Sequence, residues 1–315
     1  GAADDINVTL TGTLTASAAD GTGGIFVTET GAMSVNTIDA GVGVIELEST
    51  GAITDAAGND ETTDVSGADL TIRDSTGIGV DVDNALNLSV DNLTITTTSN
   101  DAFITEANGI GLGTVNVVAN ALDLRAITGD ITNNTSAVTA GDLTLTATAD
   151  GGAIGATGAA DDINVTLSGT LTASAADGTG GIFISQTGDL TLGAVNADVT
   201  SGGDVEIETT GTLDTTAAAD IVGDNVTLTL AADKLLTVDA DTSITGETNV
   251  TLVSDEMTLS SAGGDLIGAG AGGTLLLRAV ENETNLDLGS GAGADGSGTG
   301  DAGTLALDTT DLGAL

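Results

Sequence analysis

Two pairs of adjacent carboxylic acids are the residues whose type and spacing come closest to catalytic machinery. Asp4 and Asp5 form the first pair, and Asp161 and Asp162 form the second. Two carboxyl groups can serve as general acid and general base in glycoside hydrolysis. Adjacent residues on an extended chain point to opposite faces, however, so neither pair places its two groups side by side. We therefore expect each pair to lie in a solvated turn, and we expect that the chain is not an enzyme.

The remaining chemical inventory is narrow. The 315 residues include no His, no Cys and only four basic side chains, which are Arg73, Arg125, Lys234 and Arg278. Disulfides and thiolate metal sites are therefore excluded. No phosphate-binding or dinucleotide-binding glycine motif follows a strand and opens a helix, so the many Gly-x-Gly strings indicate turns.

The formal net charge of −43 restricts the ligands that the chain can hold. Nucleic acids are excluded because their phosphates would be repelled. Calcium is the ligand that carboxylates, Asn side chains and turn carbonyls favour. The glycine-rich segment 289–301 carries Asp295 and Asp301, which we name as candidate calcium ligands, with a flexible loop as the alternative. We expect that the fold requires no cofactor, with calcium as the one candidate ion.

A long internal duplication organises the chain. Residues 1–26 reappear as residues 158–183 with a single substitution, and diverged matches continue beyond this block. Such self-similarity is typical of repeat architectures. We predict two repeat units, 1–157 and 158–315, that form one continuous rod within a much longer polypeptide.

Short segments in which two apolar residues flank a polar one recur along both units. Strict alternation of this kind predicts β-strands, and most of these segments follow Gly, Asn or Asp, which are typical of turns. Successive segments lie somewhat over twenty residues apart on average, a spacing typical of solenoids. No window shows the periodicity of an amphipathic helix, and the spacing is too long for the hairpins of a β-sandwich. We predict an all-β fold, a parallel β-helix of about fourteen coils and roughly 65 to 70 Å in length. Examples of the segments are Val8–Leu10, Ile45–Leu47, Leu70–Ile72, Leu93–Ile95, Val115–Val117, Leu143–Leu145, Leu190–Leu192, Val205–Ile207, Val226–Leu228, Val250–Leu252 and Leu305–Leu307.

The composition predicts what such a coil contains. Trp, Tyr and Pro are absent, and three Phe residues are the only aromatic ones, whereas 40% of the residues are hydrophobic. A patterned apolar fraction of this size argues against disorder. We expect Leu, Ile, Val and Ala to stack in inward ladders and Thr, Glu and Asn to point outward. Outward Thr-x-Thr strings raise a minor hypothesis of binding to ice or another ordered surface, but the outward residues vary too much from coil to coil for a regular grid.

A Gly-x-Leu-x-Leu element recurs in the chain and carries a resemblance to a known family. This pattern resembles the repeat regions of large bacterial surface proteins, the filamentous haemagglutinin-like adhesins and related giant exoproteins. The resemblance implies a right-handed β-helix stalk that is secreted and displayed at the cell surface, and it implies no catalytic residues. The elements are Gly141–Leu145, Gly188–Leu192, Gly203–Ile207, Gly273–Leu277 and Gly303–Leu307.

The sequence therefore predicts a structural stalk or filament shaft of a giant extracellular adhesin-like protein. We expect its partners to be neighbouring repeats of the same chain, end-to-end or lateral self-association, and a cell surface or matrix contacted through other regions. We expect no nucleic-acid partner and no membrane-spanning part in this segment. The alternative is an extracellular matrix module that binds calcium or a carbohydrate through its acidic outer face.

Overall fold

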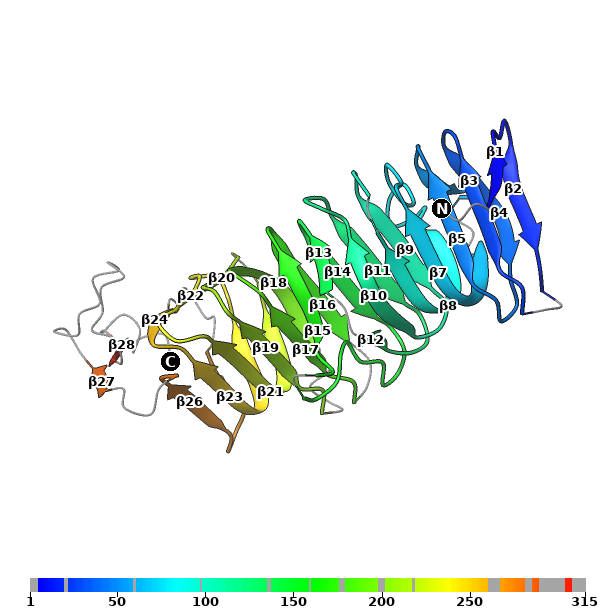
Figure 1. Ribbon diagram of the computed structural model, residues 1–315. Helices are drawn as coiled ribbons and strands as arrows, with labels where there is room; N and C mark the ends of the chain where they lie inside the picture. Colours follow the sequence, from blue (N-terminus) through cyan, green and yellow to red (C-terminus); the bar gives the residue numbers. More distant parts are fainter. Residues whose placement is uncertain are drawn as a thin grey trace. The chain divides into compact units, whose positions relative to one another are not determined.

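The computed structural model describes residues 5–19, 22–58, 61–96, 98–134, 137–158, 160–175, 179–197, 202–216, 219–259, 267–280, 285–288 and 304–307. Every regular element among these residues is a β-strand, and the described strands pair in parallel (Figure 1). Among them there is no helix, and so none long and apolar enough to span a membrane. The predicted parallel β-helix is confirmed.

The chain divides into two compact units, which are described separately below. Unit 1 comprises residues 1–149 and 163–166, and unit 2 comprises residues 150–162 and 167–315.

The first fourteen strands belong to unit 1. They are β1 (Ile6–Val8), β2 (Thr13–Ser17), β3 (Ile25–Glu29), β4 (Met33–Asp39), β5 (Ile45–Ser49), β6 (Ile53–Asp55), β7 (Val65–Arg73), β8 (Leu86–Ile95), β9 (Ala102–Glu106), β10 (Ile110–Asn116), β11 (Leu122–Ala126), β12 (Ile131–Asn133), β13 (Ala137–Ala140) and β14 (Leu143–Ala147).

The remaining strands begin with β15, most of which is assigned to unit 1, and continue through unit 2. They are β15 (Ile163–Leu167), β16 (Thr170–Ala175), β17 (Ile182–Gln186), β18 (Leu190–Ala197), β19 (Val205–Thr209), β20 (Leu213–Thr215), β21 (Ile221–Leu230), β22 (Leu235–Val238), β23 (Ile244–Val253), β24 (Glu256–Leu259), β25 (Ile267–Ala269), β26 (Thr274–Arg278), β27 (Asn285–Leu288) and β28 (Thr304–Leu307).

Columns of aliphatic side chains form the core of unit 1. Ile25 of β3 pairs in register with Ile45 of β5, which pairs with Leu70 of β7, which in turn pairs with Leu93 of β8. All four side chains are at most 7% exposed. Burying a side chain of this size contributes about 1.5 to 3 kcal/mol, so each turn adds its own share of stability. The expected inward ladders are thus present.

Unit 2 repeats this construction. Ile182 of β17 pairs in register with Val205 of β19, followed by Val226 of β21 and Val250 of β23. The outward positions that pair along these strands carry Glu in β19 and Thr in β21, as expected, whereas β17 carries Phe183 and Ser185 there. The alternation of inward apolar and outward polar residues therefore determines which face of each strand packs in the core.

The solenoid has about eleven turns, so the prediction of about fourteen was too high. The excess arose because apolar–polar–apolar segments on different faces of one turn were counted as separate turns. Leu190–Leu192 of β18 pairs with β20, whereas Val205–Ile207 of β19 pairs with β17 and β21. These two segments lie on different faces of the solenoid, so counting each segment as one turn gives too many turns.

Candidate functional site

The acidic residues predicted from the sequence fall in different surroundings. Asp295 and Asp301, the candidate calcium ligands, lie outside the described residues, as does Asp4. Asp161 is exposed at a turn, whereas Asp162 is only 3% exposed. The expectation that both members of the second pair are solvated was therefore wrong for Asp162, which is buried just before β15.

Asp162 lies near three other carboxylates in unit 2. Burial, together with the negative charges of Glu206, Glu208 and Asp161, raises the pKa of Asp162 to about 6. Burial also raises the pKa of Glu206, with Glu208 and Asp204 adding to this effect. These carboxyl groups retain protons more strongly than ordinary surface acids, first because burial disfavours their charged form and second because other carboxylates lie nearby.

In unit 1 the matching strand β5 carries Glu46 and Glu48, and a basic side chain lies beside these two carboxylates. Arg73 of β7 lies in register above Glu48 of β5, and its Nε lies 2.5 Å from Oε1 of Glu46. In unit 2 the residue in register above Glu208 is Thr229, which carries no charge. The two copies therefore differ in charge at one outward position of an otherwise similar strand.

A second set of functional groups lies inside the coils, at the last position of five-residue strands. Glu29, Ser49, Glu106, Gln186 and Thr209 occupy this position, and each is at most 4% exposed. A buried polar group needs hydrogen-bond partners because leaving it unsatisfied costs about 1 to 3 kcal/mol. We call these five side chains the corner residues, because each hydrogen-bonds to the backbone near a turn.

The duplicated corner shows two solutions to the same problem. Both carboxylate oxygens of Glu29 accept from the backbone N–H of Leu10, at 3.1 and 3.0 Å. At the repeated position, Gln186 accepts from the N–H of Leu167 at 3.1 Å and donates to the carbonyl of Asp189 at 2.8 Å. A neutral amide and a carboxylate can thus both form the hydrogen bonds that the backbone at this turn requires.

Glu106 is a corner residue with a strongly raised pKa. Its carboxylate accepts from the N–H of Val90 at 3.1 Å and from the N–H of Asn108 at 3.0 Å. Burial raises the pKa of Glu106 to about 7, and these backbone hydrogen bonds offset only part of that cost. The group therefore releases its proton near neutral pH.

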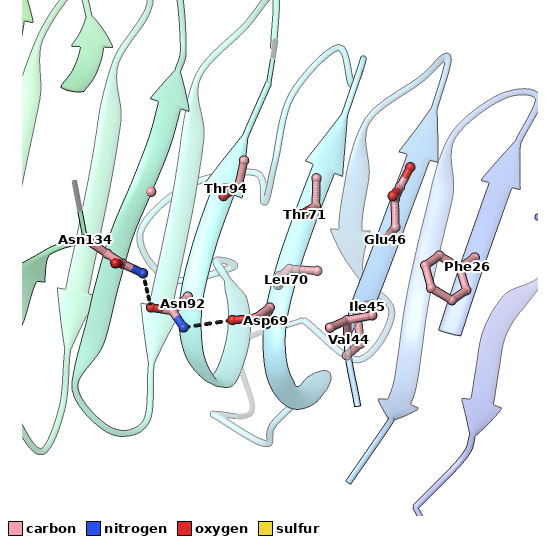
Figure 2. Close-up of a pocket in the computed structure, with 11 residues that line it drawn as sticks. Phe26, Val44, Ile45, Glu46, Asp69, Leu70, Thr71, Asn92, Thr94 and Asn134 are labelled. Atoms are coloured by element: carbon pink, nitrogen blue, oxygen red, sulfur yellow. Dashed lines mark hydrogen bonds between the residues drawn. The ribbon is translucent and has the colours of Figure 1, made fainter. Parts of the chain in front are cut away.

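The outward face of unit 1 contains a groove of about 400 Å³ (Figure 2). It crosses β3, β5, β7, β8 and β10. One column of its lining consists of Phe26, Glu46, Thr71 and Thr94, which lie in register on successive strands. The groove therefore follows the stacking direction of the coils rather than the direction of a strand.

A ladder of polar side chains lies beside this column. The amide of Asn92 donates to Oδ1 of Asp69 at 2.7 Å, and the amide of Asn134 donates to Oδ1 of Asn92 at 2.7 Å (Figure 2). Gly111 lies in register with Asn92, and a Cβ atom at that position would be 2.5 Å from Oδ1 of Asn92. The absence of a side chain at Gly111 lets Asn134 reach across one turn.

A second glycine keeps the groove open. A Cβ atom on Gly113 would lie 2.6 Å from the hydroxyl oxygen of Thr94. In unit 2 the repeated strand places Leu276 in register with Thr251, the counterpart of Thr94, and Leu276 is 45% exposed. The second copy thus carries a large side chain where the first copy carries none.

The described residues contain no group of three or more Asp or Glu side chains placed to hold a metal ion. Comparison of the chain with models of protein families, with characterised proteins and with solved structures yields no match.

Proposed function

We propose that the chain is a structural stalk or filament shaft of an extracellular adhesin-like protein, at the surface of the cell. The observation that supports this proposal is the coil-to-coil pairing within each unit. In unit 2, for example, all five residues of β17 pair in register with β19, and all five of β19 pair with β21. Parallel ladders of this kind distribute stiffness and stability over every turn, as a rigid spacer requires.

The outer surface also suits a spacer. Outward polar side chains on neighbouring turns hydrogen-bond to one another, as Asn225 does to Asp204 at 2.7 Å and Asn249 does to Asn225 at 2.8 Å. A net charge of −43 keeps like surfaces apart in dilute salt. Such a surface keeps neighbouring stalks from adhering laterally at low ionic strength, so we propose that self-association occurs end to end.

The stalk proposal predicts a calcium-independent fold. We expect a β-type circular dichroism spectrum in EDTA, and we expect 1 M NaCl to raise the Tm by about 5 °C relative to 0.1 M NaCl because salt screens the repulsion within a chain of net charge −43. Calcium chloride at matched ionic strength is expected to give the same Tm within about 2 °C.

The measurement is thermal melting in EDTA, in NaCl and in CaCl₂, with MgCl₂ as the control for divalent charge. A chain that folds only when calcium is added, while magnesium has no effect, would reject the self-sufficient stalk. That outcome would favour a calcium-dependent matrix module instead.

A further inference from the structure

We propose that the groove on the outward face of unit 1 binds a neutral oligosaccharide. The site is formed by Phe26, Glu46, Asp69, Thr71, Asn92 and Thr94. This inference goes beyond the stalk function and does not depend on it.

The charges in the groove favour a neutral ligand. Glu46 is paired with Arg73, and Asp69 accepts a hydrogen bond from the amide of Asn92. A cationic ligand would have to compete with Arg73, and an anionic ligand would be repelled by a chain of net charge −43. A ligand without formal charge meets neither obstacle.

The polar groups of the groove match hydroxyl groups, which both donate and accept hydrogen bonds. Asn92 uses one N–H and one lone pair in the ladder, so its amide retains a second N–H and a second lone pair. Thr71 and Thr94, which are half-buried residues in register with each other, bring two hydroxyls to the adjacent column. Because the ladder already fixes the amide of Asn92, little side-chain freedom is lost when a ligand binds.

Apolar surface is present at one end of the same groove. The half-buried ring of Phe26 and the 42% exposed side chain of Val44 lie at this end, and Asn134 lies at the other (Figure 2). Binding sites commonly combine an apolar surface with a few polar groups that fix orientation. A sugar ring presents both an apolar C–H face and a polar rim, whereas a small inorganic ion presents only charge.

The direction of the groove favours a linear chain of sugars. It spans four strand-to-strand steps from β3 to β10, which correspond to roughly 19 Å at about 4.8 Å per step. Each step from β3 to β8 presents one outward residue of the column, so successive sugar units would meet Phe26, Glu46, Thr71 and Thr94 in turn. In unit 2, Leu276 occupies the place that Gly113 has in unit 1. Unit 2 therefore serves as an internal control for binding in the groove.

Isothermal titration calorimetry can test the site with three neutral pentasaccharides, namely cellopentaose, maltopentaose and fully N-acetylated chitopentaose. Spermidine and pentagalacturonate serve as the cationic and anionic probes. We expect at least one neutral pentasaccharide to bind, and we expect Gly113→Leu to weaken its Kd at least tenfold. Leu276→Gly, the reciprocal change in unit 2, is expected to leave that Kd within about twofold.

A second variant keeps the test decisive if Gly113→Leu fails to fold. Thr71→Val removes one half-buried hydroxyl with little change of shape, and we expect it to weaken the Kd about five- to tenfold, the range for loss of one hydrogen bond. The proposal is overturned if no neutral pentasaccharide binds, or if binding is unchanged in folded variants of the groove. It is also overturned if spermidine or pentagalacturonate binds there more tightly than every neutral probe.

Discussion

Replacing Glu106 with Gln is expected to raise the free energy of unfolding by about 3 kcal/mol at pH 8 and to change it little at pH 4. The reason is that Glu106 is fully buried and its pKa is raised to about 7. At pH 8 the folded chain must therefore hold a buried charge. Gln has nearly the same shape and carries no charge, so the variant avoids this cost.

The sign of the effect follows from proton linkage. Because the pKa of Glu106 is about 7 in the folded chain and 4.5 in the reference state, the folded chain binds the proton more tightly. Stability from this group is therefore complete below pH 4.5 and is lost as the pH rises toward 7. The difference between wild type and Glu106→Gln should open over this interval and stay constant above it.

Gln186 supplies the structural precedent for the Glu106 variant. Its Oε1 accepts from a backbone N–H, and its Nε2 donates to the carbonyls of Leu167 and Asp189. By position, the carbonyls of Val90 and Gly109 would be the corresponding acceptors for Gln at 106. The reciprocal variant Gln186→Glu loses both donated bonds and is expected to destabilise the fold at pH 8 by about 3 kcal/mol.

Urea denaturation of wild type and both variants at pH 4, 6 and 8 measures these differences directly. Parallel pH profiles for wild type and Glu106→Gln would show that Glu106 does not hold its proton in the fold. Destabilisation by Glu106→Gln at pH 8 would contradict the prediction outright.

The strands of the core could be predicted from the sequence because their signal is local. In β5, Ile45 and Leu47 alternate with Glu46 and Glu48, and this alternation alone determines which side chains are buried. The number of turns could not be obtained in the same way. Strands on different faces of a turn have the same alternation, and only the pairing distinguishes them.

The corner residues were missed, although the sequence does contain a signal for them. In four of the five corners the polar side chain is followed by Thr and then by Gly, as in Glu29–Gly31 and Gln186–Gly188. The polar residue falls on an inward position of its strand, which breaks the alternation and looks like the end of the strand. The side chain is buried because it forms hydrogen bonds with backbone groups near the turn.

The groove could not be predicted, because it depends on contacts between distant residues. Asn134 reaches Asn92 across 42 positions of sequence, and it does so only because Gly111 lies between them. Gly113 also lies within an irregularity of the register between Leu112 and Val115. The local sequence pattern does not show which distant residues come together, since the pattern of each turn is that of an ordinary strand.

Gly43→Ala is expected to destabilise unit 1 by about 3 kcal/mol or more and to lower its Tm by roughly 6 to 12 °C. A Cβ atom on Gly43 would lie 2.1 Å from the carbonyl oxygen of Gly23 on the neighbouring turn and 3.0 Å from that of Ala40. Both obstacles are backbone atoms, so the clash can be relieved only by separating two turns that hydrogen bonds hold together. Gly23→Ala is the matched control, because a Cβ atom there would have no neighbour within 4 Å.

Hydrogen exchange can show where the Gly43→Ala variant loses stability. The amide of Ile25 donates to the carbonyl of Val44 at 2.9 Å, and the amide of Ala68 donates to the carbonyl of Gly43 at 2.9 Å. Both amides should exchange faster when the turns separate, whereas amides of β19 in unit 2 should keep their protection because a repeat fold opens locally. Equal melting of the Gly43→Ala and Gly23→Ala variants would contradict the close stacking of these turns. Uniform loss of protection in both units would instead show that a turn of this solenoid cannot open without unfolding the whole chain.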